Sequence, residues 1–141
     1  MSIVHDFEAA FNRRDVGALV ACFTPTGSYA DTFFGSHEGH EELRAMFDRM
    51  FHEGKDYCWT MESVVETPAR AAAEWRFSYV VSDAIPRSAG RAVSFKGMSL
   101  FELSGGKIAA YREHFDTGAA LLQLGFKPDS IAKVLARKHG L

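Results

Sequence analysis

Residues 57–83 read "YCWTMESVVETPARAAAEWRFSYVVSD", and here the hydrophobic period of the chain changes from about 3.6 residues to 2. One face of the second half carries large apolar side chains, at Trp75, Phe77, Tyr79 and Val81. The alternate positions between them are polar, with Glu74, Arg76 and Ser78. Because strand residues point to opposite faces in turn, the pattern predicts two long strands, over 57–67 and 70–83.

Hydrophobic periods also predict the elements before and after these two strands. Residues 92–104, "AVSFKGMSLFELS", and 107–116, "KIAAYREHFD", predict two more strands joined by a tight turn at the two glycines. Helical spacing of apolar residues predicts helices over 3–14, 16–23, 40–53, 117–126 and 128–141. An isolated strand is expected near residues 27–34, followed by a turn between Gly35 and Gly39. This order predicts one α+β domain over 1–141, with helices packed on one face of a curved antiparallel (mixed) sheet.

Composition and charge exclude several classes of partner. The chain has 141 residues and a formal net charge of -2, without a basic block, so nucleic acid is not an expected partner. No apolar run approaches the roughly 20 residues that span a bilayer, so no membrane partner is expected either. The N-terminal residues carry early charges, unlike a secretory signal, and we expect a cytoplasmic protein. Cys22 and Cys58 have no metal-ligand spacing and are expected to be reduced, buried thiols.

Asp31 is an unusual residue for its position. In "GSYADTFFGSHEG", residues 27–39, it shares a strand face with Tyr29 and Phe33, although aspartate is a poor strand former. Two interpretations are open: Asp31 faces water where the strand ends, or it lines a pocket.

Glu113 poses the same question near the end of the last strand, where it shares a face with Tyr111 and Phe115. It could line the same pocket, or pair with Arg112 or Arg76 at the surface. Two carboxylates in one apolar cavity would push their pKa values apart, leaving one as an acid and one as a base.

The histidines do not predict a metal site. His37 and His40 lie in "HEGHE", whose second histidine comes one residue too early for the HExxH motif of zinc proteases. Solvated surface histidines are the favoured interpretation for His37, His40 and His52. No metal and no cofactor is expected.

Three stretches together resemble a known group: "FEAAFNRRDVGALVACF" at 7–23, "GSYADTFFG" at 27–35 and "GGKIAAYREHFD" at 105–116. They resemble the SnoaL-like, ketosteroid isomerase-like families of the nuclear transport factor 2 fold, over nearly the whole chain. The resemblance implies a cone-shaped sheet curled around an apolar pocket and closed by helices. It also implies a homodimer, since the family commonly dimerises through the open face of the sheet. The fold hosts isomerases, hydrolases, cyclases and binding modules, so it does not fix the activity.

The resemblance also implies roles for single residues. The general-base aspartate of ketosteroid isomerases falls at Asp31, and their two oxyanion donors correspond to Phe7 and Ser99. In limonene-epoxide hydrolases, which the chain partly resembles, an acid lies at the position of Glu113, and two water-holding residues lie at Tyr29 and Asp31. SnoaL-type cyclases use an acid from the last strand, for which Glu113 is the match.

We therefore expect a small-molecule enzyme that uses carboxylate acid/base chemistry, of isomerase, hydrolase or cyclase type. Its substrate would be an apolar carbonyl, epoxide or polyketide-like molecule; the alternatives are an apolar-ligand-binding module without turnover and a structural dimer module. The candidate catalytic residues are Asp31, Glu113, Tyr29 and Tyr111. The expected pocket wall consists of Phe7, Phe33, Phe47, Trp59, Trp75, Phe77, Tyr79, Phe95, Ser99, Phe101 and Phe115.

Overall fold

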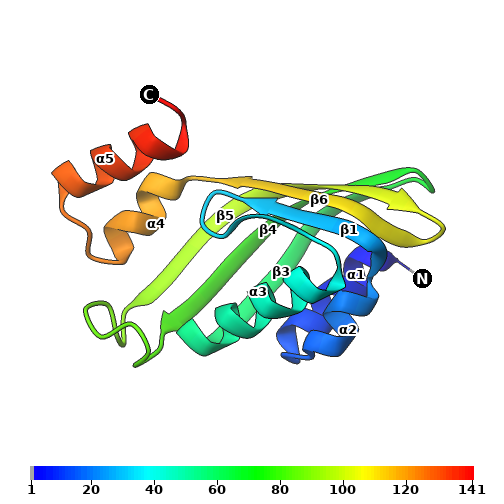
Figure 1. Ribbon diagram of the computed structural model, residues 1–141, viewed down its shortest axis with the longest axis horizontal. Helices are drawn as coiled ribbons and strands as arrows, with labels where there is room; N and C mark the ends of the chain where they lie inside the picture. Colours follow the sequence, from blue (N-terminus) through cyan, green and yellow to red (C-terminus); the bar gives the residue numbers. More distant parts are fainter. Residues whose placement is uncertain (1) are drawn as a thin grey trace.

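Six strands form one curved sheet in the computed structural model, which describes residues 2–141 (Figure 1). The strand order across the sheet is β2-β1-β6-β5-β4-β3. The strands are β1 (Phe23–Asp31), β2 (Gly35–Glu38), β3 (Gly54–Glu66), β4 (Arg70–Val81), β5 (Ala92–Ser104) and β6 (Lys107–Phe115). Neighbouring strands are antiparallel except β1 and β6, which run parallel. The predicted α+β class with a curved, mixed sheet is confirmed.

Five helices accompany the sheet: α1 (Ile3–Asn12), α2 (Val16–Ala21), α3 (His40–Glu53), α4 (Thr117–Gln123) and α5 (Pro128–Lys138). The first three lie together against one face of the sheet, and α4 and α5 lie at the end where β6 leaves it (Figure 1). Asp15 and Asp116 cap α2 and α4, as each carboxylate accepts a backbone N–H at 3.0 Å. None of the helices in residues 2–141 is long and apolar enough to cross a membrane.

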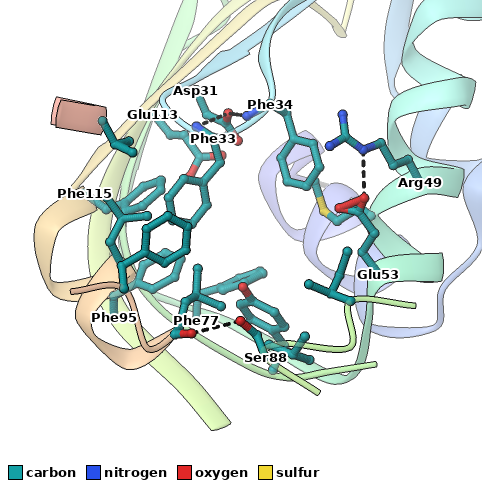
Figure 2. Close-up of a pocket in the computed structure, with 18 of the residues that line it drawn as sticks. Asp31, Phe33, Phe34, Arg49, Glu53, Phe77, Ser88, Phe95, Glu113 and Phe115 are labelled. Carbon is teal, nitrogen blue, oxygen red and sulfur yellow. Dashed lines mark hydrogen bonds and ion pairs between the residues drawn. The ribbon is translucent and has the colours of Figure 1, made fainter. Parts of the chain in front are cut away.

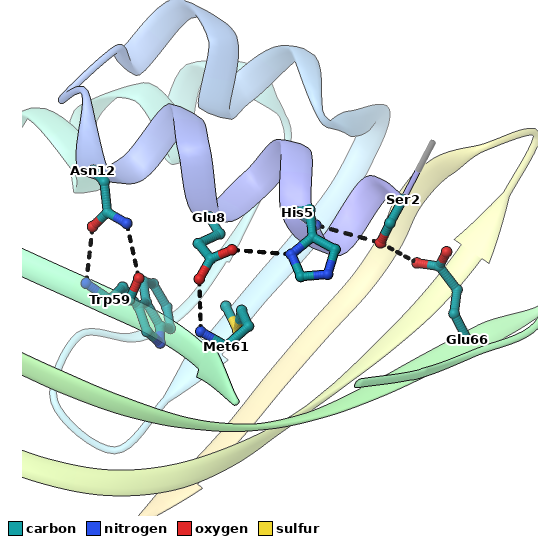
Figure 3. A network of polar contacts seen from close by, with 7 residues as sticks. All are labelled: Ser2, His5, Glu8, Asn12, Trp59, Met61 and Glu66. Carbon is teal, nitrogen blue, oxygen red and sulfur yellow. Dashed lines mark hydrogen bonds and ion pairs between the residues drawn. The ribbon is translucent and has the colours of Figure 1, made fainter. Parts of the chain in front are cut away.

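Helix α1 is fixed to the sheet by apolar and polar contacts. Phe7 and Phe11 are fully buried, and their rings meet Trp59 of β3 edge-on at 5.2 and 4.9 Å. The Asn12 amide bonds both backbone groups of Trp59 at 2.8 Å, and Glu8 accepts the backbone N–H of Met61 at 2.7 Å (Figure 3). These side-chain bonds occupy three backbone groups on the outer edge strand β3, which reduces the number of unpaired groups along that edge.

Two expectations are corrected. The segment Gly35–Glu38 is a strand rather than a turn, because it pairs with the end of β1, Asp31 opposite Gly35. The turn is instead at 32–34, so Phe33 lies just outside the strand. Cys58 is exposed and only Cys22 is buried, because Cys58 alternates with the inward-facing Trp59.

Candidate active site

A cavity of about 430 Å³ lies between the inner face of the sheet, α3 and the two C-terminal helices. Its wall is largely aromatic, and Figure 2 shows the rings of Phe33, Phe77, Phe95 and Phe115 turned into the space. Six residues of the expected wall line it: Phe33, Trp59, Phe77, Tyr79, Phe95 and Phe115. This size and lining are typical of a small-molecule site.

Five other residues expected in the wall lie in the core beneath it instead: Phe7, Phe47, Trp75, Ser99 and Phe101. All are at most 4% exposed. Strand alternation assigns Trp75, Ser99 and Phe101 to the inner face, but it does not say how far along the cone the helices fill the space. Near α1 the space is filled: Phe7 packs against Phe101 at 5.9 Å.

Glu113 is the buried acid of the cavity. It is 5% exposed, projects inward from β6 and lines the space. Its Oε1 accepts the hydroxyl of Tyr29 at 2.5 Å and that of Tyr111 at 3.2 Å. The surface pairing considered above does not occur, because Arg112 binds Glu102 at 2.7 Å and Arg76 binds Glu62 at 2.9 Å.

The surroundings of Glu113 favour its neutral form. Burial and, to a smaller extent, the nearby Asp31 raise the pKa of Glu113, the two tyrosine hydroxyls lower it, and the balance is a pKa of about 8. In neutral solution Glu113 therefore keeps its proton. With Oε1 bonded to two hydroxyls, Oε2 is the oxygen free to donate that proton into the cavity.

Asp31 lies at the last residue of β1, at the same end of the cavity as Glu113 (Figure 2). Its Oδ1 accepts the backbone N–H groups of Phe33 and Phe34, at 2.9 and 2.5 Å. Burial raises the pKa of Asp31, but the backbone donors of the turn oppose the rise, and so does Lys138. Both interpretations of Asp31 thus apply: it ends the strand and also lines the pocket.

A buried polar chain runs from the core to Glu113. The Trp75 indole donates to Ser99 Oγ at 2.7 Å, and Ser99 Oγ lies 2.7 Å from the Tyr111 hydroxyl. Tyr111 does not line the cavity but reaches it through Glu113, whereas Tyr29 lines it directly. Of the four candidate catalytic residues, three therefore face the cavity and Tyr111 supports one of them.

The histidines stand apart from this cavity. His37 and His40 are half-buried and bond backbone carbonyls through Nε2, His37 to Phe34 at 2.5 Å and His40 to Phe23 at 3.0 Å. They hold the segment around β2 in place rather than pointing freely into water. Among residues 2–141, no group of three histidine, cysteine or acidic side chains could hold a metal ion.

Charged residues at the cavity rim were missed from the sequence: Arg49, Glu53, Arg87, Arg137 and Lys138. Arg49 binds Glu53 at 2.9 Å, one helical turn away on α3, which the i,i+4 spacing could have predicted. The other three lie in the 82–91 loop and on α5, and no sequence signal brings these segments together.

Solved structures share this fold. A protein of ketosteroid isomerase-like fold from Catenulispora acidiphila, in complex with trimethylamine, is 19% identical with a TM-score of 0.78, covering 90% of this chain and 95% of its own. A candidate polyketide cyclase from Pseudomonas putida is 20% identical with a TM-score of 0.74, covering 87% and 98%. An LEH-like epoxide hydrolase from M. tuberculosis is 16% identical with a TM-score of 0.71, covering 96% and 93%. At these identities the likeness shows the fold alone.

No curated protein matches the chain. The SnoaL-like domain family, however, matches residues 4–111, which is most of the sequence and includes β1 with Asp31 and β6 up to Tyr111, but not Glu113. Together with the curved sheet and its cavity, this match establishes that the chain belongs to the SnoaL-like family.

Proposed function

We propose that the protein is an enzyme that moves a proton at an apolar carbonyl substrate, using Asp31 and Glu113 as a base and an acid. The observation that carries this proposal is Glu113, a buried acid with a pKa raised to about 8, beside a second carboxylate in an open aromatic cavity. Two carboxyl groups whose surroundings push their pKa values apart are the usual arrangement for acid/base catalysis.

In this mechanism Asp31 is the base. Its Oδ1 is held by two backbone N–H groups, so the carboxylate has a fixed orientation. It removes a proton from the carbon next to the substrate carbonyl. The electron pair of the broken C–H bond forms an enolate, and Glu113 donates a hydrogen bond or its proton to the enolate oxygen. Tyr29 and Tyr111 keep the Glu113 carboxyl oriented through Oε1.

The enolate then has two outcomes. It can take a proton back at another carbon, which is an isomerisation, or it can attack a second carbonyl of the same molecule, which is a cyclisation. The fold shared with a candidate polyketide cyclase supports including the second outcome. The fold shared with an epoxide hydrolase keeps a hydrolase in the proposal, with Glu113 protonating the epoxide oxygen and Asp31 activating water.

A non-catalytic binding module is the second candidate. The bonds from Asp31 to the 32–34 turn give this residue a structural purpose without any chemistry. The aromatic wall would then hold an apolar ligand without turnover.

Hydrogen exchange at carbon separates the two candidates. A panel of apolar cyclic and aromatic ketones and diketones is incubated with the protein in heavy water, and deuterium uptake next to the carbonyl is measured by NMR. We expect wild type to accelerate exchange for some members, and Asp31→Asn and Glu113→Gln each to remove most of the acceleration. Glu53→Gln is the matched control, since Glu53 lines the same cavity but is paired with Arg49.

Binding of panel members without accelerated exchange, or exchange that survives both substitutions, would contradict the enzyme proposal and favour the binding module. The homodimer also stays a prediction. Light scattering of the purified chain decides it, and a monomeric mass would exclude it.

A further inference from the structure

The rim of the cavity differs in charge from the rest of the molecule. Four cationic side chains line the cavity and are exposed to solvent, which places them at its mouth: Arg49, Arg87, Arg137 and Lys138. Among residues 2–141, only two acids other than the buried Glu113 line it, Asp31 and Glu53. The cavity lining thus has two surplus positive charges, although the whole chain carries a formal net charge of -2.

The ion pairs of these four cations show which of them have no acidic partner. Arg49 is paired with Glu53, and Lys138 acts on Asp31 by lowering its pKa. Arg87 and Arg137 form no ion pair within residues 2–141. The surplus therefore comes from two guanidinium groups, one in the 82–91 loop and one at the end of α5.

Arg87 is also held in place. Its guanidinium lies over the ring of Phe126 at 5.7 Å, and Phe126 lines the cavity as well. A guanidinium stacked on a ring keeps its N–H donors free at the edges, where they can bind a carboxylate with two hydrogen bonds. Phe126 lies between α4 and α5, so this stacking holds the 82–91 loop against the segment that precedes α5, whereas Arg137 lies at the other end of that helix, beside Lys138, which acts on Asp31.

From these observations we infer that the substrate of this site is an apolar molecule that carries a carboxylate, which Arg87 binds at the rim. The apolar body then lies along the aromatic wall, between Arg87 and the Asp31–Glu113 end. The inference rests on the proposed function, because the bound molecule is a substrate only if the protein is an enzyme. A ligand without turnover would be bound in the same way. The inference adds a chemical class to the proposed function: the carbonyl substrate also carries a free acid group, unlike a neutral ketone or a hydrocarbon.

An acid in the substrate also suits the cavity chemically. The carboxylate of Asp31 at the inner end would repel a substrate carboxylate placed there. Arg87 favours the opposite orientation, with the acid outward and the apolar part, including its carbonyl, inward. The charge pattern thus gives the substrate one direction in the cavity.

The test compares two probes that differ only in charge, naphthylacetate and naphthylacetamide. Their dissociation constants are measured by calorimetry in neutral buffer at low and at high ionic strength. An exposed ion pair is worth up to about fivefold in Kd, so Arg87 should give the acid an advantage of up to about fivefold at low salt. Arg87→Gln should remove this advantage and leave amide binding unchanged. Lys133→Gln, which removes a charge from an exposed position of α5 outside the cavity, should leave it intact.

Equal affinity for acid and amide, a preference for the amide, or no binding of either probe would overturn the inference. An advantage that survives Arg87→Gln would overturn it too. This experiment measures binding, so its result is independent of the hydrogen-exchange test, which measures catalysis. If the protein accelerates hydrogen exchange but does not prefer the acid probe, only the inferred substrate class is wrong. If it prefers the acid probe but does not accelerate exchange, only the proposed catalysis is wrong.

Discussion

Removing the ionisable group of Glu113 should change how stability depends on pH. The folded chain holds this proton with a pKa of about 8, whereas an unfolded chain ionises the same group near the ordinary value of 4.5. Between these values the unfolded state loses the proton and the folded state keeps it, so rising pH favours unfolding. The loss begins near pH 4.5 and is complete above about pH 8.

The magnitude follows from the gap between the two pKa values. Each pKa unit corresponds to about 1.4 kcal/mol, so the full effect is about 5 kcal/mol, of which about 3–4 kcal/mol falls between pH 5 and pH 8. At this chain length that loss lowers Tm by about 10 °C. Burial of Asp31 acts in the same direction, because its pKa is also raised.

The assay is chemical denaturation of wild type and Glu113→Gln at a series of pH values. Glutamine keeps an oxygen that accepts from Tyr29, but it cannot ionise. We expect the stability of wild type relative to the variant to fall by about 3–4 kcal/mol from pH 5 to pH 8. The difference between wild type and Glu53→Gln should show no such fall. Parallel curves for wild type and Glu113→Gln would refute the reasoning, since they would mean that Glu113 ionises alike in both states.

Three further substitutions test the packing and bonding around the site. Tyr29→Phe removes a donor that lowers the pKa of Glu113, so the pH-dependent loss of stability should have its midpoint at higher pH, and an unchanged midpoint would contradict this. Ser99→Ala leaves the Trp75 indole N–H without its partner and should cost about 1–3 kcal/mol in urea denaturation, so a cost near zero would show that the bond adds nothing. Gly97→Ala would place a Cβ 2.5 Å from the Trp75 ring and 2.7 Å from the His114 carbonyl, and calorimetry should show it about 1–3 kcal/mol less stable unless the strand yields.

Much of the fold could be predicted from the sequence, because its elements follow local patterns. The period of two in residues 70–81 and the capping residues Asp15 and Asp116 depend only on neighbouring positions. The strand β2 could not be predicted, since "GSHE" has no apolar alternation and is a strand only because β1 lies beside it. The exposure of Cys58 did have a signal, as it alternates with Trp59 and Met61.

The candidate site shows the same division. The inward direction of Glu113 follows from strand alternation, but its place opposite Ser99 also needs the register shift between Glu102 and Leu103, because the tight turn alone would pair Ser99 with Arg112. The contact between Tyr29 and Glu113 joins residues 84 positions apart, and the parallel pairing that creates it has no sequence signal. The depth of the cavity depends on how far the helices fill the space inside the curved sheet. Strand and helix patterns do not show this, so Phe7 and Phe101 were expected in the cavity wall, although they lie buried in the core beneath it.

The most direct test of this account is to observe the proton on Glu113. Carbon NMR of the protein labelled at its glutamate carboxyl groups, recorded across pH, follows each carboxyl separately, and the Glu113→Gln variant identifies the signal. The account predicts a signal, absent from the variant, that changes with a midpoint at about pH 8. A signal for Glu113 that changes near the ordinary glutamate pKa of about 4.3 would contradict it, because Glu113 would then be ionised in neutral solution and could not serve as the acid.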